Sequence, residues 1–277
     1  MIKRYHEAPL CIFKDVQKLT DGDYALVHLF ETDRTYFSMF KDAVARGRDV
    51  ILDNSIFELG TAFDGDRFAY WIEKLQPTWY IVPDSWKNGE ETCEMYFDFI
   101  EKHPDLPGKK IAVAQGKTYN EVVTTYDELK SFCDMIAFNL DFSSIYYDRM
   151  PADTRQKVPY CLAMSYGRYD ILTQMDRDGI IDHSMPHHLL GCGVPQEVQW
   201  YPESATWIRS IDTSNPVING MHFNYYGPTG LCVKPNTKAC DIMNISLDLG
   251  QVSAIWHNIV LMKSWCNKWE GAHGTNN

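Results

Sequence analysis

The sequence has no long hydrophobic run. No window of its 277 residues approaches the roughly eighteen uninterrupted apolar residues that a bilayer-spanning helix needs, and residues 1–7 lack the apolar core of a signal peptide. The eight cysteines are scattered, several of them within apolar runs, which is typical of reduced thiols rather than of a disulfide framework. Because a membrane span and a signal peptide are not indicated, we expect a cytoplasmic protein with no membrane partner. The chain also lacks repeats, low-complexity tracts and interdomain linkers.

Basic residues are in short supply. Lys and Arg number 26 against 37 Asp and Glu, a formal net charge of −11. A protein that grips a phosphate backbone usually has a basic surface, and an acidic balance fits a small substrate better. The overall charge does not exclude a local patch, because Lys109, Lys110 and Lys117 bracket one predicted strand and Lys234 and Lys238 lie close together.

Short apolar runs that end on polar residues are the most informative feature that is present. Buried parallel strands are continuous hydrophobic runs, and in a (β/α)8 barrel their carboxyl ends deliver side chains to one mouth. The pattern therefore predicts a TIM barrel of the α/β class. The runs cover residues 50–53, 80–84, 111–115, 188–191 and 207–212.

The order of the predicted elements agrees with this fold. Strands are expected at 24–30, 50–53, 79–82, from 109, and at 135–139, 187–191 and 207–211, with helical patterns between them, and residues 221–226 are a candidate eighth strand or hairpin arm. A last helix is predicted over 249–269, and 273–277 should fray. The length is near the typical 250 or so residues of one barrel, so we expect a single domain, 1–277, with an irregular carboxyl-terminal part, 213–277.

Two aspartates at strand ends are the candidate catalytic pair. Asp53 and Asp212 each follow a buried run, and two carboxylates at one mouth are the minimum needed to break a glycosidic bond. Either residue taken alone is more often a helix cap or part of a turn. The neighbouring His187 and His188 point to opposite faces of a strand, so at most one of them enters the barrel.

The segments around these residues resemble the tRNA-guanine transglycosylase superfamily, and more closely its DNA-acting 7-deazaguanine transglycosylases of phages and bacterial DNA-modification clusters. The similar segments follow the family's order along the chain. They are Asp53-Asn-Ser-Ile-Phe-Glu, Pro83-Asp-Ser, Val113-Ala-Gln-Gly, Leu189-Leu-Gly-Cys-Gly-Val-Pro and Ile211-Asp-Thr-Ser-Asn-Pro.

The resemblance implies an exchange of guanine in DNA for a 7-deazaguanine base. Asp212 would attack the sugar and form a covalent glycosyl-enzyme, while Asp53 would move the proton of the base. The base itself would be bound by Asp84, Gln115, Phe57, Leu190, Gly191 and Asn139. The partners would be DNA and guanine or 7-deazaguanine, and a phage-encoded protein would work in the host cytoplasm.

The chain departs from the family at two places. Ser55-Ile56 replaces a glycine pair beside the first aspartate, which changes the backbone near the base. The family's zinc knuckle is also missing, because the remaining candidate ligands lack its close spacing. These candidates are Cys232, Cys240, His257 and Cys266, which fit better as buried thiols and a helix-face histidine. We therefore expect no required cofactor, with a structural zinc as the disfavoured alternative.

Other functions remain open at this stage. The same scaffold acting on tRNA is the near alternative, and a barrel hydrolase of small nucleosides or N-glycosides fits the acidic charge. A barrel that has lost catalysis and serves as a binding partner is the third, for which Ser55-Ile56 is the best argument. The sequence does not decide whether the chain forms a homodimer or binds an accessory protein.

Overall fold

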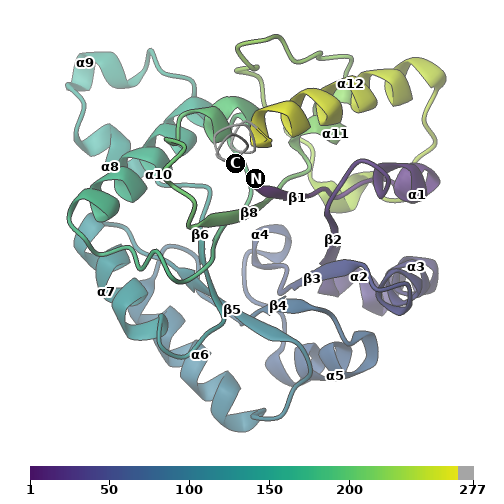
Figure 1. The fold of residues 1–277 in the computed structure, drawn as a ribbon, viewed down its shortest axis with the longest axis horizontal. Coiled ribbons are helices and arrows are strands. Elements are labelled where there is room, and N and C mark those ends of the chain that lie inside the picture. Colours follow the sequence, from purple (N-terminus) through teal and green to yellow (C-terminus); the bar gives the residue numbers. More distant parts are fainter. Residues whose placement is uncertain (268–277) are drawn as a thin grey trace, which may run out of the picture. The chain divides into compact units, whose positions relative to one another are not determined.

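The protein is a closed barrel of parallel strands with helices between them. The computed structural model describes residues 1–267, and its eight strands pair in chain order from β1 to β8 (Figure 1). The predicted (β/α)8 fold class is therefore confirmed. The strands are β1 Lys3–Tyr5, β2 Gly22–Leu26, β3 Asp49–Asp53, β4 Trp79–Ile81, β5 Lys109–Ala114, β6 Met135–Phe138, β7 His187–Leu189 and β8 Ile208–Asp212.

Helices follow most of the strands. Those up to β6 are η1 Leu10–Ile12, α1 Phe13–Val16, α2 Val27–Thr32, α3 Arg34–Ala45, α4 Ile56–Leu59, α5 Gly65–Leu75, α6 Gly89–Lys102 and α7 Tyr119–Leu129. The later ones are α8 Ser143–Asp148, α9 Ala152–Arg155, α10 Tyr160–Arg177, η2 Pro195–Gln199, α11 Asn215–Met221, η3 Ala239–Ile242 and α12 Leu249–Cys266.

Contacts divide the chain into two compact units. Gly22–Phe138 forms one, here called the central unit, and Met1–Asp21 together with the chain from Asn139 onward forms the other, called the terminal unit. The central unit holds β2 to β6 and the terminal unit holds β1, β7 and β8. The single-domain limits 1–277 stay a prediction.

The central unit is built from buried apolar strands and capped helices. Ile51, Leu52, Ile111 and Ala112 have no exposed surface, as expected for strands of a parallel sheet that is covered on both faces. Its longer helices begin at side chains that accept a backbone N–H of the first turn, which fixes where each helix starts. These caps are Asp33 for α3, Asp64 for α5, Asn88 for α6 and Thr118 for α7.

The terminal unit joins the two ends of the described chain. β1 pairs with β8, so that Tyr5 lies opposite Asp212. Arg4 is buried and forms an ion pair with Asp21, and its Nη1 donates to the Lys263 carbonyl of α12 at 3.2 Å. α12 begins at Asp248, which forms a capping box with Gln251.

Several predicted elements need correction. The expected strand 24–30 is β2, which ends at Leu26, and α2 takes over from Val27. The candidate eighth strand at 221–226 is wrong: the remaining strand is the short β1, and Asn215–Met221 is helical. Three residues are too few to show a strand periodicity, which is why β1 gave no sequence signal. The segment 273–277 lies outside the described residues.

None of the helices within residues 1–267 combines the length and the apolarity that membrane spanning requires. The proposed cytoplasmic location stays a prediction.

The packing of α10 on the preceding loop yields a test of the fold. A Cβ added at Gly167 would lie 2.2 Å from the Phe142 carbonyl oxygen, whereas one added at Gly65 would meet only Phe99 at an ordinary 3.6 Å. We expect Gly167→Ala to lower the free energy of unfolding by about 1–3 kcal/mol, because the backbone itself must move. Gly65→Ala, the control, should change it little. Urea unfolding measures both, and equal stabilities would contradict this close approach.

Candidate functional site

The terminal unit holds one candidate catalytic carboxylate, Asp212, at the carboxyl end of β8. Its Oδ1 lies 2.9 Å from His188 Nε2 and accepts the Gly191 backbone N–H at 2.9 Å. His188 Nδ1 lies 2.8 Å from Ser210 Oγ. The three side chains form a continuous hydrogen-bonded chain, and all of them are buried.

Strand geometry explains why these residues meet. Ser210 and Asp212 are two residues apart on β8 and therefore share a face, and His188 lies opposite Ser210 on β7. His187 has a different neighbour, because its ring packs edge-on against Trp207, and the pairing of β7 with β8 shifts register between the two histidines. That they point to opposite faces stays a prediction.

The hydrogen bonds to Asp212 are one-sided. Both go to Oδ1, and within residues 1–267 no group donates to Oδ2. Oδ2 is not one of the fully buried side-chain atoms that lack a partner, so it has accessible surface. One oxygen is thus held in place while the other is available to a ligand. This arrangement suits a carboxylate that accepts a proton.

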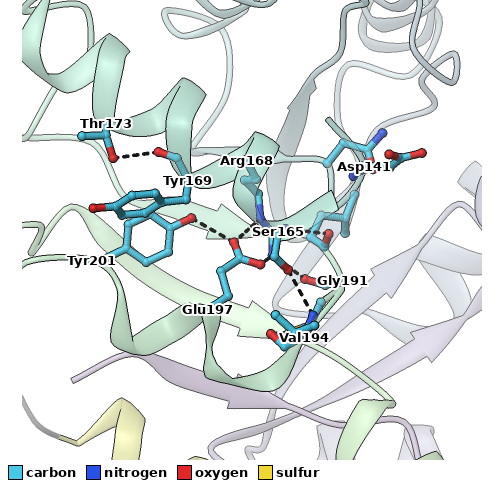
Figure 2. Close-up of polar contacts among 12 residues, drawn as sticks. Asp141, Ser165, Arg168, Tyr169, Thr173, Gly191, Val194, Glu197 and Tyr201 are labelled. Carbon is cyan, nitrogen blue, oxygen red and sulfur yellow. Dashed lines mark hydrogen bonds and ion pairs between the residues drawn. The ribbon is translucent and has the colours of Figure 1, made fainter. Parts of the chain in front are cut away.

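A buried ion pair holds the turn that binds Asp212. Arg168 of α10 pairs with Glu197 of η2 at 2.7 Å, and neither side chain has any exposed surface (Figure 2). The same guanidinium donates to the carbonyl oxygens of Leu190 at 3.0 Å and Gly191 at 2.9 Å. The Gly191 N–H in turn donates to Asp212, so the ion pair positions the carboxylate through one peptide unit.

Electrostatics favour the charged form of this pair. Burial alone would lower the pKa of Arg168, but the Glu197 carboxylate outweighs burial and raises the pKa above its ordinary value. Tyr201 donates its hydroxyl to Glu197 at 2.9 Å, and burial raises the pKa of that hydroxyl well above 10.0. A fully hydrogen-bonded buried pair of this kind is costly to break.

Gly191 has a backbone conformation that favours glycine. Its φ is +70°, and a Cβ at this position would lie 2.9 Å from a side-chain carbon of Leu140. The glycine thus allows the turn after β7 to approach closely enough for its N–H to reach Asp212.

The central unit holds a second polar cluster, at the carboxyl ends of β3, β4 and β5. Asp84 accepts Asn54 Nδ2 on Oδ1 and Gln115 Nε2 on Oδ2, each at 2.7 Å. Gln115 Oε1 accepts the Lys87 N–H at 3.0 Å, and Asn54 Oδ1 accepts the Ile56 N–H at 3.0 Å. The structure therefore brings Asp84 and Gln115 together as a cross-link between neighbouring strand ends.

Asp53 lies at the end of β3 in the same unit. It accepts the Tyr24 hydroxyl on one oxygen and the Ser55 N–H on the other. Ser55 is a buried non-glycine residue with a φ of +62°. The turn after Asp53 thus has a left-handed conformation, which glycine would adopt without strain. For Ser55 this conformation costs about 1–3 kcal/mol. The convergence of Asp53 and Asp212, which belong to different units, stays a prediction.

The other predicted base-binding residues have different environments. Phe57 is 45% exposed, and its ring lies 5.9 Å from that of Trp86. Asn139 is buried and accepts the Asp141 N–H at 3.3 Å. Leu190 and Gly191 contribute backbone groups to the turn described above. Their predicted role in base binding remains untested.

The candidate zinc ligands do not form a site. No three His, Cys, Asp or Glu side chains of residues 1–267 form a group that could hold a metal ion. Cys232 is exposed, Cys266 is buried, and His257 Nε2 lies 2.9 Å from the Tyr226 carbonyl oxygen. The expectation that no cofactor is required stays a prediction.

Sequence reasoning missed most of the residues that support Asp212. Arg168 and Glu197 lie within an ordinary helical pattern and a turn, and nothing in the sequence indicates that they pair. The sequence does contain one signal, because His188 and Asp212 lie at two predicted strands. This signal does not indicate that His188 contacts Asp212.

Comparisons with known proteins assign the chain to no family. No protein-family model matches it, and no curated protein matches it either. Similar solved structures include methylaspartate ammonia lyase from Clostridium tetanomorphum, with 10% identity, a TM-score of 0.44, and coverage of 98% of this chain and 60% of the other. L-talarate dehydratase from Polaromonas sp. JS666, complexed with Mg and L-glucarate, has 6% identity, a TM-score of 0.38, and coverage of 76% and 50%.

A third similar structure is the L-talarate/galactarate dehydratase from Salmonella typhimurium LT2. It has 9% identity and a TM-score of 0.41, with coverage of 79% of this chain and 49% of the other. The chain thus spans about half to three fifths of the length of these proteins. Likeness at this level does not assign their activities or their metal to this chain.

The expected membership of the tRNA-guanine transglycosylase superfamily is wrong. No family model supports it, and the similar structures are dehydratases and ammonia lyases, not glycosyltransferases. The predictions that fall with it are guanine exchange in DNA or tRNA, a glycosyltransferase or nucleoside hydrolase activity, and a role in DNA modification. Short motifs at strand ends misled because any parallel barrel places polar residues there. The expected partners, namely DNA, tRNA, a purine base or a second copy, are not tested.

The Arg168–Glu197 pair yields a stability prediction. Arg168→Met should lower the free energy of unfolding by about 3–5 kcal/mol, because it leaves the Glu197 carboxylate buried without a partner. The double variant with Glu197→Met should recover part of this loss. Urea unfolding of the single and double variants measures the difference. A double variant less stable than Arg168→Met would contradict this account.

Asp84 yields a pH prediction. Burial is the largest influence on its pKa and raises it above the ordinary 3.8, against the opposing hydrogen bonds of Asn54 and Gln115. The folded protein thus holds this proton more tightly than the unfolded chain does. The free energy of unfolding should therefore fall as pH rises from 3.8 through the raised pKa. Urea unfolding at a series of pH values measures this. Relative to Asp84→Asn, the wild type should lose free energy of unfolding as pH rises from 3.8 through the raised pKa of Asp84.

Asp66→Asn is the matched control for this series. The Lys102 hydrogen bond lowers the pKa of Asp66 below its ordinary 3.8. Relative to Asp66→Asn, the wild type should therefore gain stability as pH rises, and it should do so only below 3.8. A constant difference between wild type and Asp84→Asn across the series would contradict a raised pKa for Asp84.

Proposed function

We propose that the protein is an enzyme in which Asp212 accepts a proton from a small substrate bound at the carboxyl ends of the strands. The observation that carries the proposal is the one-sided hydrogen bonding of this carboxylate, with Oδ1 held by His188 and Gly191 and Oδ2 open. The position at a strand end agrees with the place of active sites in barrels of this class.

The Ser210–His188–Asp212 chain supports a role in proton transfer. A base needs a fixed orientation toward the proton that it removes, and His188 together with the Gly191 N–H supplies that orientation. Ser210 Oγ at 2.8 Å from His188 Nδ1 fixes the ring in turn. A base that is itself oriented by a further group is a common arrangement in catalytic sites.

The reaction class that fits is removal of a proton from carbon, as in lyases, dehydratases and isomerases. A carboxylate at this position needs only to accept the proton on Oδ2, and the described residues supply hydrogen bonds that hold it in place. A catalysed proton transfer of this kind contributes about 10²–10⁴-fold to a rate. The acidic net charge of −11 is compatible with a small substrate.

Proton exchange in D2O provides a test that does not require the full reaction. The wild-type protein should wash out a carbon-bound proton from at least one compound in a panel of 2-hydroxy, 2-amino and 2-oxo acids and aldoses, followed by ¹H NMR. Asp212→Asn keeps the shape but loses the base, so we expect exchange at least about 100-fold slower. The measurement is the initial exchange rate of each compound.

A surface pair provides the matched control. His183 Nε2 lies 2.6 Å from Asp176 Oδ1, on the exterior of the same unit. Asp176→Asn removes a carboxylate with the same kind of histidine contact and should leave exchange unchanged. Exchange by Asp212→Asn at the wild-type rate, or no exchange of any compound by the wild type, would contradict the proposal.

A further inference from the structure

The helix α12 of the terminal unit is apolar on two opposite faces. Ile255 and Ile259 lie on the face that has no exposed surface, and the helix packs on α11, β1 and η2 (Figure 1). The opposite face carries Leu249, Trp256 and Val260, which are 89%, 43% and 52% exposed. A surface helix normally presents charged and polar residues to water on its outer face. The outer face of α12 is therefore unusual for a helix that only covers a barrel.

Charged side chains are nearly missing from α12, which the structure describes in full. Lys263 is the only Asp, Glu, Lys or Arg among its eighteen residues, and it is only partly exposed. The whole chain, in contrast, has a net charge of −11. Two copies of such an acidic protein repel each other across most of their surfaces. The outer face of α12 brings no like charges together, so it is a place where a second copy can dock.

Two aromatic residues before α12 extend this face. The side chains of Phe223 and Tyr225 are about half exposed. The Tyr225 ring lies 5.4 Å from the ring of His257, and a Cβ added at Gly250 would lie 3.1 Å from Phe223 Cε1. Both aromatic residues therefore lie against α12. The exposed side chains, here called the apolar patch, are those of Phe223, Tyr225, Leu249, Trp256 and Val260.

The loop that carries Tyr225 is fixed on α12 by the buried side chain of Asn258. Its Oδ1 accepts the Tyr226 N–H at 2.8 Å, and its Nδ2 donates to the Asn224 carbonyl oxygen at 3.0 Å. Association orders side chains and loops at a cost, and a surface that is already held in place avoids part of this cost. The apolar patch is thus prepared for contact with a rigid partner.

The area of the apolar patch fits the centre of a protein interface. Its five side chains together expose on the order of 500 Å², since a whole aromatic side chain presents about 150–250 Å². Contiguous apolar patches of this size often mark interaction sites. A standard interface buries about 800 Å² on each partner, and its rim is polar. The apolar patch therefore supplies the apolar part that one partner needs.

We propose that the apolar patch is the interface of a homodimer, in which α12 of one copy packs antiparallel on α12 of the other about a two-fold axis. The two copies then use the same surface, which must be complementary to itself. A face without charged side chains meets this condition. Trp256 lies near the middle of α12 and faces its own copy across the axis. This inference does not depend on the proposed role of Asp212.

Sedimentation equilibrium of the full chain tests the oligomeric state. We expect the mass of two chains at micromolar concentrations, with dissociation on dilution. The mass of a single chain throughout the micromolar range would overturn the proposal.

Val260→Glu and Phe132→Glu are a matched pair that locates the interface. Both side chains are 52% exposed, but Phe132 belongs to the central unit and is not part of the apolar patch. Val260→Glu should weaken the dimer at least about 30-fold, because each copy would bury an unpaired carboxylate. Phe132→Glu should leave the dissociation constant unchanged. Equal constants for the two variants would contradict this interface.

Opposite charges at Trp256 test the two-fold axis and exclude misfolding. Trp256→Glu and Trp256→Lys should each sediment as a single chain, because two like charges meet at the axis. An equimolar mixture of the two variants should recover part of the dimer, because Glu then faces Lys. Such recovery requires that both variants are folded. If each variant alone still forms the wild-type dimer, or if the mixture fails to associate, Trp256 does not face its own copy and the proposal fails.

Discussion

The buried ion pair between Arg168 and Glu197 is the interaction on which the candidate site depends. Its guanidinium binds two successive carbonyl oxygens of the turn after β7, and the N–H of that turn holds Asp212. Charges with no exposed surface are retained only when all their hydrogen-bonding groups have partners, and here Tyr201 and the backbone provide them. The position of Asp212 therefore depends on Arg168 of α10, which holds the turn that binds Asp212.

The two polar clusters differ in what they leave available. In the central unit, each Asp84 oxygen already accepts an amide hydrogen, and the amides of Asn54 and Gln115 are themselves held by backbone groups. In the terminal unit, Asp212 Oδ2 has no donor among the described residues, whereas Oδ1 accepts two hydrogen bonds. An open acceptor next to a fixed one distinguishes a site that can bind a ligand from a network that holds strand ends together.

Much of the fold could be predicted from hydrophobic periodicity. The runs ending at Asp53 and Asp212 became β3 and β8. The prediction failed at β1 and at 221–226. A three-residue strand has no measurable period, and the segment 221–226, which lies between loops with Gly and Pro, was mistaken for the missing strand although its first residue ends α11. The resemblance to a transglycosylase family failed for a related reason, since short strand-end motifs recur in unrelated barrels.

The sequence by itself determined the alternation of strands and helices, and with it that Asp53, Asp84, Gln115 and Asp212 follow buried runs. That information is local, because it is carried by neighbours within one element. Only the tertiary structure decided which side chains meet. Arg168 with Glu197, His188 with Asp212, and His6 with Thr213 are 29, 24 and 207 residues apart. Which acceptor remains open depends on these distant contacts, and no periodicity records them.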